Sequence, residues 1–146
     1  MATITIRRSI AAAPATVFQA VAHIEQFSEA IPHITKVEML SEVREGVGTR
    51  FRETRLMKGR EATTELEVTE YEPDQRVRLV ADSHGTVWDS LFTVKPEGAG
   101  SVLTLTMEAR AYRLLSKLMN PLISGMIKKA VGEDMDAVKA FCERDA

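Results

Sequence analysis

The sequence has 146 residues, of which 45% are hydrophobic and 27% are charged, and its formal net charge is −2. These values are ordinary for one globular domain, and the chain is long enough to bury a substantial core. The nearly balanced charge argues against electrostatic capture of nucleic acid or of an anionic membrane, so neither is expected as a partner.

Few features of the sequence bear on cellular location. Cys142 is the only cysteine, so no internal disulfide can form, which fits a reducing compartment. Arg7 and Arg8 precede an apolar stretch, but Pro14 interrupts it too early for a secretory signal. No stretch approaches the ~18 apolar residues that a membrane span needs. We therefore expect a cytoplasmic protein without stable membrane insertion, as a monomer or a homodimer.

The N-terminal part predicts one strand followed by two short helices. Isoleucines alternate with polar residues over about Ala2 to Ile10, which is typical of a strand. Pro14 suits the first position of a helix, because its missing N–H would have no partner there. Apolar residues then recur at helical spacing until Pro32 ends the run.

From about residue 34 to residue 110 the apolar period is two, which predicts six strands. Residues 61–69 alternate most clearly, with one apolar face and one charged or polar face. Short connections are expected at Lys58–Gly59, Pro73–Asp74, His84–Gly85 and residues 96–100. Connections this short require an antiparallel sheet, here with one wet face and one apolar face.

The last segment, about Tyr112 to Glu143, predicts one long helix with a kink at Pro121. Its apolar residues form a stripe that drifts in phase along the helix: Leu115, Leu118, Met119, Leu122, Met126, Ile127, Val131, Val138 and Cys142. Only a large curved sheet could cover such a stripe, and a sheet bent in this way often leaves a hollow. We expect an α+β fold in a single domain over residues 1–146.

Several local motifs occur in one order along nearly the whole chain: Ala13–Phe18, Phe27 with Pro32, Gly48–Phe51, Tyr71–Pro73 with Arg76, and Gly100–Ser101. In this order the sequence resembles the START-like (SRPBCC) superfamily, in particular its polyketide cyclase/dehydrase and lipid-transport branch. The resemblance implies a helix-grip fold, in which a seven-stranded curved antiparallel sheet surrounds the C-terminal helix. Members include cyclases, dehydrases, transfer proteins, hormone receptors and allergens, so the resemblance leaves the chemistry open.

The sequence lacks the common catalytic and cofactor motifs. It contains no G-x-S-x-G, H-E-x-x-H, C-x-x-C or P-loop pattern. The histidines at 23, 33 and 84 are isolated from one another, as surface histidines usually are. We expect neither a metal site nor a cofactor.

The strand around residue 53 carries the most informative polar residues. Period two places Glu53 and Arg55 on the same face as the apolar Phe51 and Met57. Burying either charge alone would cost several kcal/mol, so the two should pair with each other, with water or with a ligand. They would then anchor a carboxylate, hydroxyl or carbonyl group. In the alternative interpretation a β-bulge shifts the register and both charges face solvent.

Further residues are expected to face the same hollow as ligand contacts: Thr64, Leu66, Leu79, Trp88, Ser90, Phe92, Leu105, Met107, Leu115, Met119, Leu122 and Met126. Flexible methionines suit a tolerant pocket. Plain core packing explains any single one of these residues equally well. Asp134 lies on the flank of the helical stripe, between Val131 and Val138, and a second inward-facing carboxylate is one interpretation of it. Because the expected kink at Pro121 alters the phase of the helix, we expect Asp134 at the rim or on the surface.

Three functions compete. A carrier or sensor would enclose a small hydrophobic molecule, lipid-, polyketide- or aromatic-like, with few reactive groups. A cyclase or dehydratase would use Glu53 as general acid or base and Arg55 to stabilise an enolate. A protein-interaction module would expose an apolar patch, which the charged outer strand faces do not offer. The sequence favours the first and does not identify the ligand.

Overall fold

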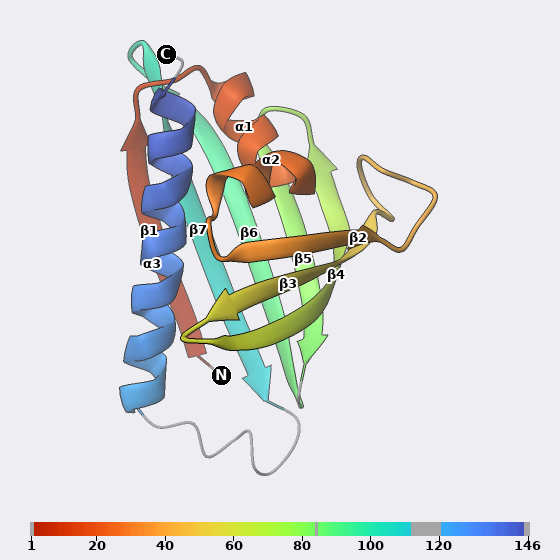
Figure 1. Cartoon of the computed structure of the whole chain (residues 1–146). Coiled ribbons are helices and arrows are strands. Elements are labelled where there is room, and N and C mark those ends of the chain that lie inside the picture. The colour runs from red at the N-terminus through yellow and green to blue at the C-terminus, as the bar shows by residue number, and fades with distance from the viewer. Residues whose placement is uncertain (1, 84, 112–120, 145–146) are drawn as a thin grey trace.

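The computed structural model describes residues 2–83, 85–111 and 121–144 (Figure 1). It contains, in chain order, β1 (Ala2–Ile10), α1 (Pro14–Ala22), α2 (Ile24–Ala30), β2 (Ile34–Met39), β3 (Arg50–Met57), β4 (Arg60–Glu72), β5 (Arg76–Ser83), β6 (Thr86–Glu97), β7 (Gly100–Ala111) and α3 (Pro121–Glu143). The predicted order of one strand, two short helices, six strands and a C-terminal helix is confirmed.

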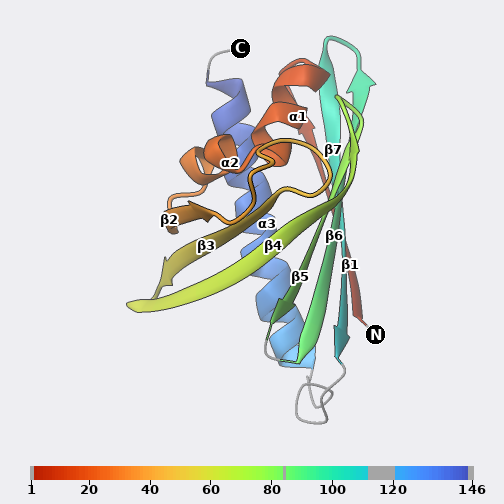
Figure 2. The same cartoon turned by 90° about the vertical axis from the view of Figure 1, so that its right-hand side faces the viewer.

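The seven strands form one antiparallel sheet in the order β1-β7-β6-β5-β4-β3-β2. The strand directions show that the sheet is strongly curved: β2 and β3 run across the axis of α3, whereas β1 runs beside it (Figure 1). The register shifts within β2 and within β4, between Val68 and Glu70, and such irregularities bend a strand. All three helices lie on the concave side (Figure 2). This is the predicted α+β helix-grip architecture.

The two short helices follow the sequence signals closely. Pro14 is the first residue of α1, and Val17, Phe18, Ala20 and Val21 are its buried face. His23 ends α1 and also precedes α2, so the two helices are joined by a single residue. Phe18 and Val17 are fully buried, so α1 anchors one end of the core.

The start of β7 is fixed against the β1–α1 connection. A Cβ on Gly100 would lie 2.5 Å from the Ile10 carbonyl oxygen, which only glycine avoids. Next to it, the Ser101 hydroxyl donates a 2.7 Å hydrogen bond to the Ala12 carbonyl. The glycine–serine pair therefore lets two strands and a helix entry meet closely.

α3 presents Val131, Met135, Val138 and Cys142 to the core. The prediction that Met126 belongs to the apolar stripe of this helix was wrong, because Met126 is 58% exposed. Met126 precedes Val131 by five residues, which rotates its side chain about 140° away from the buried face. Residues 112–120 and the side chain of Leu122 lie outside the described part of the chain, so the longer helix and its kink stay predictions. No helix in the described ranges has the length and hydropathy of a membrane span.

The convex face of the sheet carries a charged network centred on Asp89 of β6. Arg78 donates two hydrogen bonds to this carboxylate, one of them from Nε at 2.7 Å, and Arg110 donates a third. Although the Asp89 side chain is only 5% exposed, hydrogen bonding to Arg78 holds its pKa below the ordinary value.

Asp89→Asn is expected to lower the free energy of unfolding by about 1–3 kcal/mol at pH 7, since hydrogen bonds to a charged group are lost. A lowered native pKa contributes stability above the unfolded-state value of about 3.9, and this contribution disappears as the pH falls through the native pKa. The difference between wild type and variant in urea denaturation should therefore shrink below about pH 4. Glu61→Gln, at an exposed position on β4, is the control. A gap that stays constant to pH 2 would contradict this assignment.

Candidate functional site

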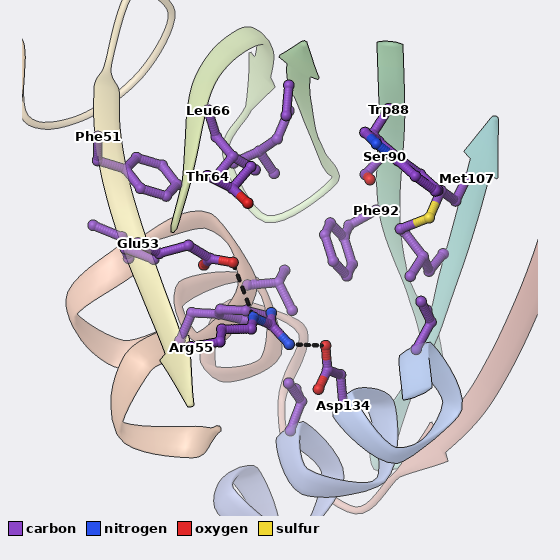
Figure 3. A pocket seen from close by; sticks show the side chains of 18 of the residues that line it. Phe51, Glu53, Arg55, Thr64, Leu66, Trp88, Ser90, Phe92, Met107 and Asp134 are labelled. Atoms are coloured by element: carbon purple, nitrogen blue, oxygen red, sulfur yellow. Dashed lines mark hydrogen bonds and ion pairs between the residues drawn. The ribbon is translucent and has the colours of Figure 1, made fainter. Parts of the chain in front are cut away.

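A cavity of about 350 Å³ lies between the concave face of the sheet and α3 (Figure 3). Most of its wall is apolar: Val21, Ala22, Ile24, Phe27, Phe51, Leu66, Leu79, Ala81, Trp88, Phe92, Leu105, Met107, Val131, Met135 and Val138. Its polar lining is Glu53, Arg55, Thr64, Ser83, Ser90 and Asp134. The hollow that the curved sheet predicted is therefore present, with few polar groups in it.

Most of the residues predicted to contact a ligand lie together around this cavity. These are Phe51, Glu53, Arg55, Thr64, Leu66, Leu79, Trp88, Ser90, Phe92, Leu105 and Met107. They come from β3 to β7, whose inward faces follow from strand alternation alone. Their role as ligand contacts stays a prediction.

Two predicted residues lie elsewhere. Met57 is 41% exposed and Met126 is 58% exposed, and neither lines the cavity. Met57 is the last residue of β3 and pairs with Arg60 at the β3–β4 hairpin, which projects away from α3 (Figure 2). Leu115 and Met119, and the side chain of Leu122, lie outside the described part of the chain.

Glu53 and Arg55 take the unshifted register, so both point into the cavity. Arg55 Nε donates a 3.0 Å hydrogen bond to Glu53 Oε1, and only 11% of the Glu53 side chain and 22% of the Arg55 side chain are exposed. The preceding arginine confirms the alternation, because Arg52 lies on the other face and contacts Glu38 and Glu65. The bulge alternative, with both charges in solvent, does not hold.

A third charge completes the cluster, and its predicted position was wrong. Arg55 Nη1 donates a 2.8 Å hydrogen bond to Asp134 Oδ2 of α3, so Asp134 is a cavity residue rather than a rim or surface residue. In Figure 3 the two carboxylates reach Arg55 from β3 and from α3. Asp134 follows Val131 by three residues, which turns it only about 60° from the buried stripe. The long arginine side chain spans the remaining gap.

The electrostatics of the cluster follow from this double pairing. Burial alone would lower the pKa of Arg55, but the charges of Glu53 and Asp134 and their hydrogen bonds outweigh it and raise the pKa above its ordinary value. Arg55 therefore stays cationic. Glu53, Arg55 and Asp134 together are called the charged cluster below.

The helical side of the cavity differs from the prediction, which placed only Leu115, Met119, Leu122 and Met126 of the C-terminal helix there. Val21 and Ala22 of α1, Ile24 and Phe27 of α2, and Val131, Met135 and Val138 of α3 also line it. The helical apolar spacing identified most of them only as members of an apolar face. Which buried residues border a hollow depends on how the sheet curves, and the sequence pattern does not specify that curvature.

His23, Tyr71 and Cys142 lie outside the cavity lining. His23 forms a hydrogen bond with Tyr71, and the Tyr71 hydroxyl donates a hydrogen bond to Glu45. Burial of the hydroxyl, and secondly its contact with the Glu45 carboxylate, raise the pKa of Tyr71 to about 12. Burial raises the pKa of the Cys142 thiol to about 11, so this cysteine is not a ready nucleophile. Within residues 2–83, 85–111 and 121–144, no group of three histidine, cysteine or acidic side chains is placed to hold a metal ion.

A family model described as polyketide cyclase / dehydrase and lipid transport matches residues 1–143. The chain belongs to this family. Membership confirms the START-like resemblance that the ordered motifs indicated. The family includes both catalysts and carriers, so it leaves the choice between them to the site.

Solved structures share the fold of this polyketide cyclase/dehydrase and lipid-transport family member at low sequence identity. TTHA0849 from Thermus thermophilus has a TM-score of 0.81 at 18% identity, with 99% of each chain covered. Ara h 8.0201 has a TM-score of 0.78 at 13% identity, with 97% of each chain covered. The di-domain ARO/CYC StfQ from the steffimycin biosynthetic pathway has a TM-score of 0.76 at 15% identity, covering 98% of this chain and 51% of StfQ. No curated protein sequence matches the chain.

Proposed function

We propose that the protein binds a small hydrophobic or amphipathic molecule in the cavity, with any polar group of the ligand at the charged cluster. The observation that carries this proposal is a largely apolar cavity with a few convergent polar groups, the usual composition of a small-molecule site. Its volume of about 350 Å³ lies at the lower end of the range for drug-sized ligands. The ligand class is therefore lipid-, polyketide- or aromatic-like and small.

The family description and the site chemistry both support this proposal. The family covers lipid transport as well as polyketide cyclisation, and both activities handle apolar molecules. The three charges of the cluster are hydrogen-bonded to one another, as buried charges must be when no ligand is bound. We propose that the protein acts as a carrier or sensor of this molecule. We also propose a cytoplasmic location, because the only cysteine is a buried free thiol.

Binding can be followed through Trp88, which lines the cavity and is the only tryptophan in the chain. Filling the cavity with Ala81→Phe should weaken binding of a hydrophobic ligand at least tenfold, because Ala81 is 4% exposed and borders the space. The measurements are native mass spectrometry of the copurified protein, to identify a ligand, and titration of Trp88 fluorescence.

Ala140→Phe is the matched control for this experiment, since Ala140 lies on the exposed face of α3. It should leave the titration unchanged. If Ala81→Phe folds normally and binds as well as the wild type does, the cavity is not the binding site.

A cyclase or dehydratase is the second candidate, because two carboxylates lie at the wall of an apolar cavity. Glu53 would remove a proton from a carbon beside a carbonyl, and Arg55 would stabilise the enolate oxygen. Glu53→Gln keeps the shape of the side chain and removes the base. If Glu53→Gln still binds a polyketide-like substrate but no longer converts it, the result supports catalysis. If the wild type converts no such substrate, the result supports the carrier or sensor function.

A further inference from the structure

The formal charges of the described residues that line the cavity do not balance. Among the described residues that line it, only Glu53, Arg55 and Asp134 have side chains with a formal charge. Two carboxylates against one guanidinium give the described part of the wall a formal charge of −1. The remaining polar lining residues, Thr64, Ser83 and Ser90, are uncharged hydroxyls and leave this balance unaltered.

The charged cluster also has hydrogen-bonding groups left for a ligand. Arg55 already uses Nε for Glu53 and Nη1 for Asp134. Within the described ranges, the hydrogen bonds of the two carboxylates to Arg55 use Glu53 Oε1 and Asp134 Oδ2. No buried side-chain oxygen there lacks a partner, so Glu53 Oε2 and Asp134 Oδ1 are open to water or to a ligand in the cavity. Ionised carboxylates are acceptors only, so these two oxygens call for a donor. Arg55 keeps one N–H on Nη1 and two on Nη2, and these can donate to an uncharged oxygen.

We propose that the cavity selects ligands whose polar group is a hydroxyl or an amine and discriminates against carboxylates; this rests on the binding function proposed above. An alcohol or phenol donates to a free carboxylate oxygen and accepts from Arg55 Nη2. An ammonium group offsets the surplus negative charge. A carboxylate would meet two like charges and one already neutralised arginine, and like charges brought together in a site of low dielectric repel strongly.

The test uses three probes that share one hydrocarbon chain: 1-decanol, decylamine and decanoate, below their micelle-forming concentrations. Each is titrated into the wild-type protein at pH 7 and followed by Trp88 fluorescence. Decanol and decylamine are expected to bind at least tenfold more tightly than decanoate. Because the chain is constant, this ratio isolates the contribution of the polar group.

Two variants change the charge of the cluster in steps. Asp134→Asn makes it neutral, and Glu53→Gln combined with Asp134→Asn makes it +1. The preference for decylamine over decanoate should shrink at least tenfold in the first variant and reverse in the second. Asp136→Asn is the matched control, since Asp136 lies two residues away on α3 and pairs with Arg8 outside the cavity. It should keep the wild-type order.

The outcomes separate the two proposals. If decanoate binds the wild type best, or if the order is the same in all four proteins, the ligand class is wrong while the binding function stands. If no probe binds or alters Trp88 fluorescence, the binding function itself fails and the selectivity fails with it. Thermal unfolding of every variant checks that it is folded, and the single substitution remains informative if the double variant is unstable.

Discussion

Arg55→Leu is expected to lower the free energy of unfolding by about 3–5 kcal/mol, because it leaves two poorly solvated carboxylates without their cation. The side chains of Glu53 and Asp134 are 11% and 19% exposed, so water can compensate for the loss only in part. Urea denaturation at pH 7 measures the effect. The loss should exceed that of an ordinary surface substitution several-fold.

Arg52→Leu is a closely matched control for this experiment. Arg52 lies on the same strand and, like Arg55, contacts two carboxylates, Glu38 and Glu65. It faces solvent, where ion pairs contribute little, so its replacement should leave the free energy of unfolding nearly unchanged. Equal losses at the two positions would mean that the cavity does not desolvate the charged cluster.

Discharging the carboxylates as well should restore stability. In the triple variant Glu53→Gln, Arg55→Leu, Asp134→Asn no charge is left without a partner, and replacing a whole buried ion cluster is often neutral or stabilising. Recovery of most of the loss would show that the unpaired charges cause it. A triple variant as unstable as Arg55→Leu would instead attribute the effect to packing of the arginine stem.

Met135→Ala is expected to cost about 2–5 kcal/mol, because a buried methionine leaves a void when it is truncated. Met135 is 1% exposed and borders the existing cavity. The enlarged void can fill with solvent or ligand more readily than a closed one, which favours the lower half of that range. Denaturation in urea, without added ligand, measures the loss.

Met126→Ala is the internal comparison for Met135→Ala, with the same substitution on the same helix. Met126 is 58% exposed, so the change should lie within about 0.5 kcal/mol. The pair of variants tests the rotation of α3 about its axis. A larger loss at Met126 than at Met135 would place the buried stripe on the other face of the helix.

The sequence predicts the strands and the first helix of this fold well because the signals for these elements are local. Pro14 begins α1 where its missing N–H costs nothing, and alternation along β3 is enough to place Phe51, Glu53 and Arg55 on one face. The register of β3 held because the extra residues of the two bulges lie in β2, opposite Arg55 and Thr54, and in β4, so that neither interrupts the alternation along β3.

The helical side of the site was harder to predict for a geometric reason. A strand has two faces, so an error of one residue is obvious, whereas the phase of a helix varies continuously and an expected kink displaces it further. Asp134 was therefore assigned to the rim and Met126 to the interior, and both assignments were wrong. The partner of Asp134 is 79 residues away in the sequence, and no local pattern encodes such a contact.

The pairing of β1 with β7 has a consequence for synthesis of the chain on the ribosome. Ser101 donates a hydrogen bond to the carbonyl of Ala12, 89 positions earlier in the sequence, and among the described strands β1 has no neighbour besides β7. At typical elongation rates, the first strand emerges roughly 4–18 s before the strand that will cover its edge. During that interval the unpaired backbone N–H and C=O groups of β1, beside its alternating isoleucines, can pair with another nascent chain. Ser9 and the two adjacent arginines of β1, which place polar and charged groups among those isoleucines, lessen the risk of aggregation in that interval.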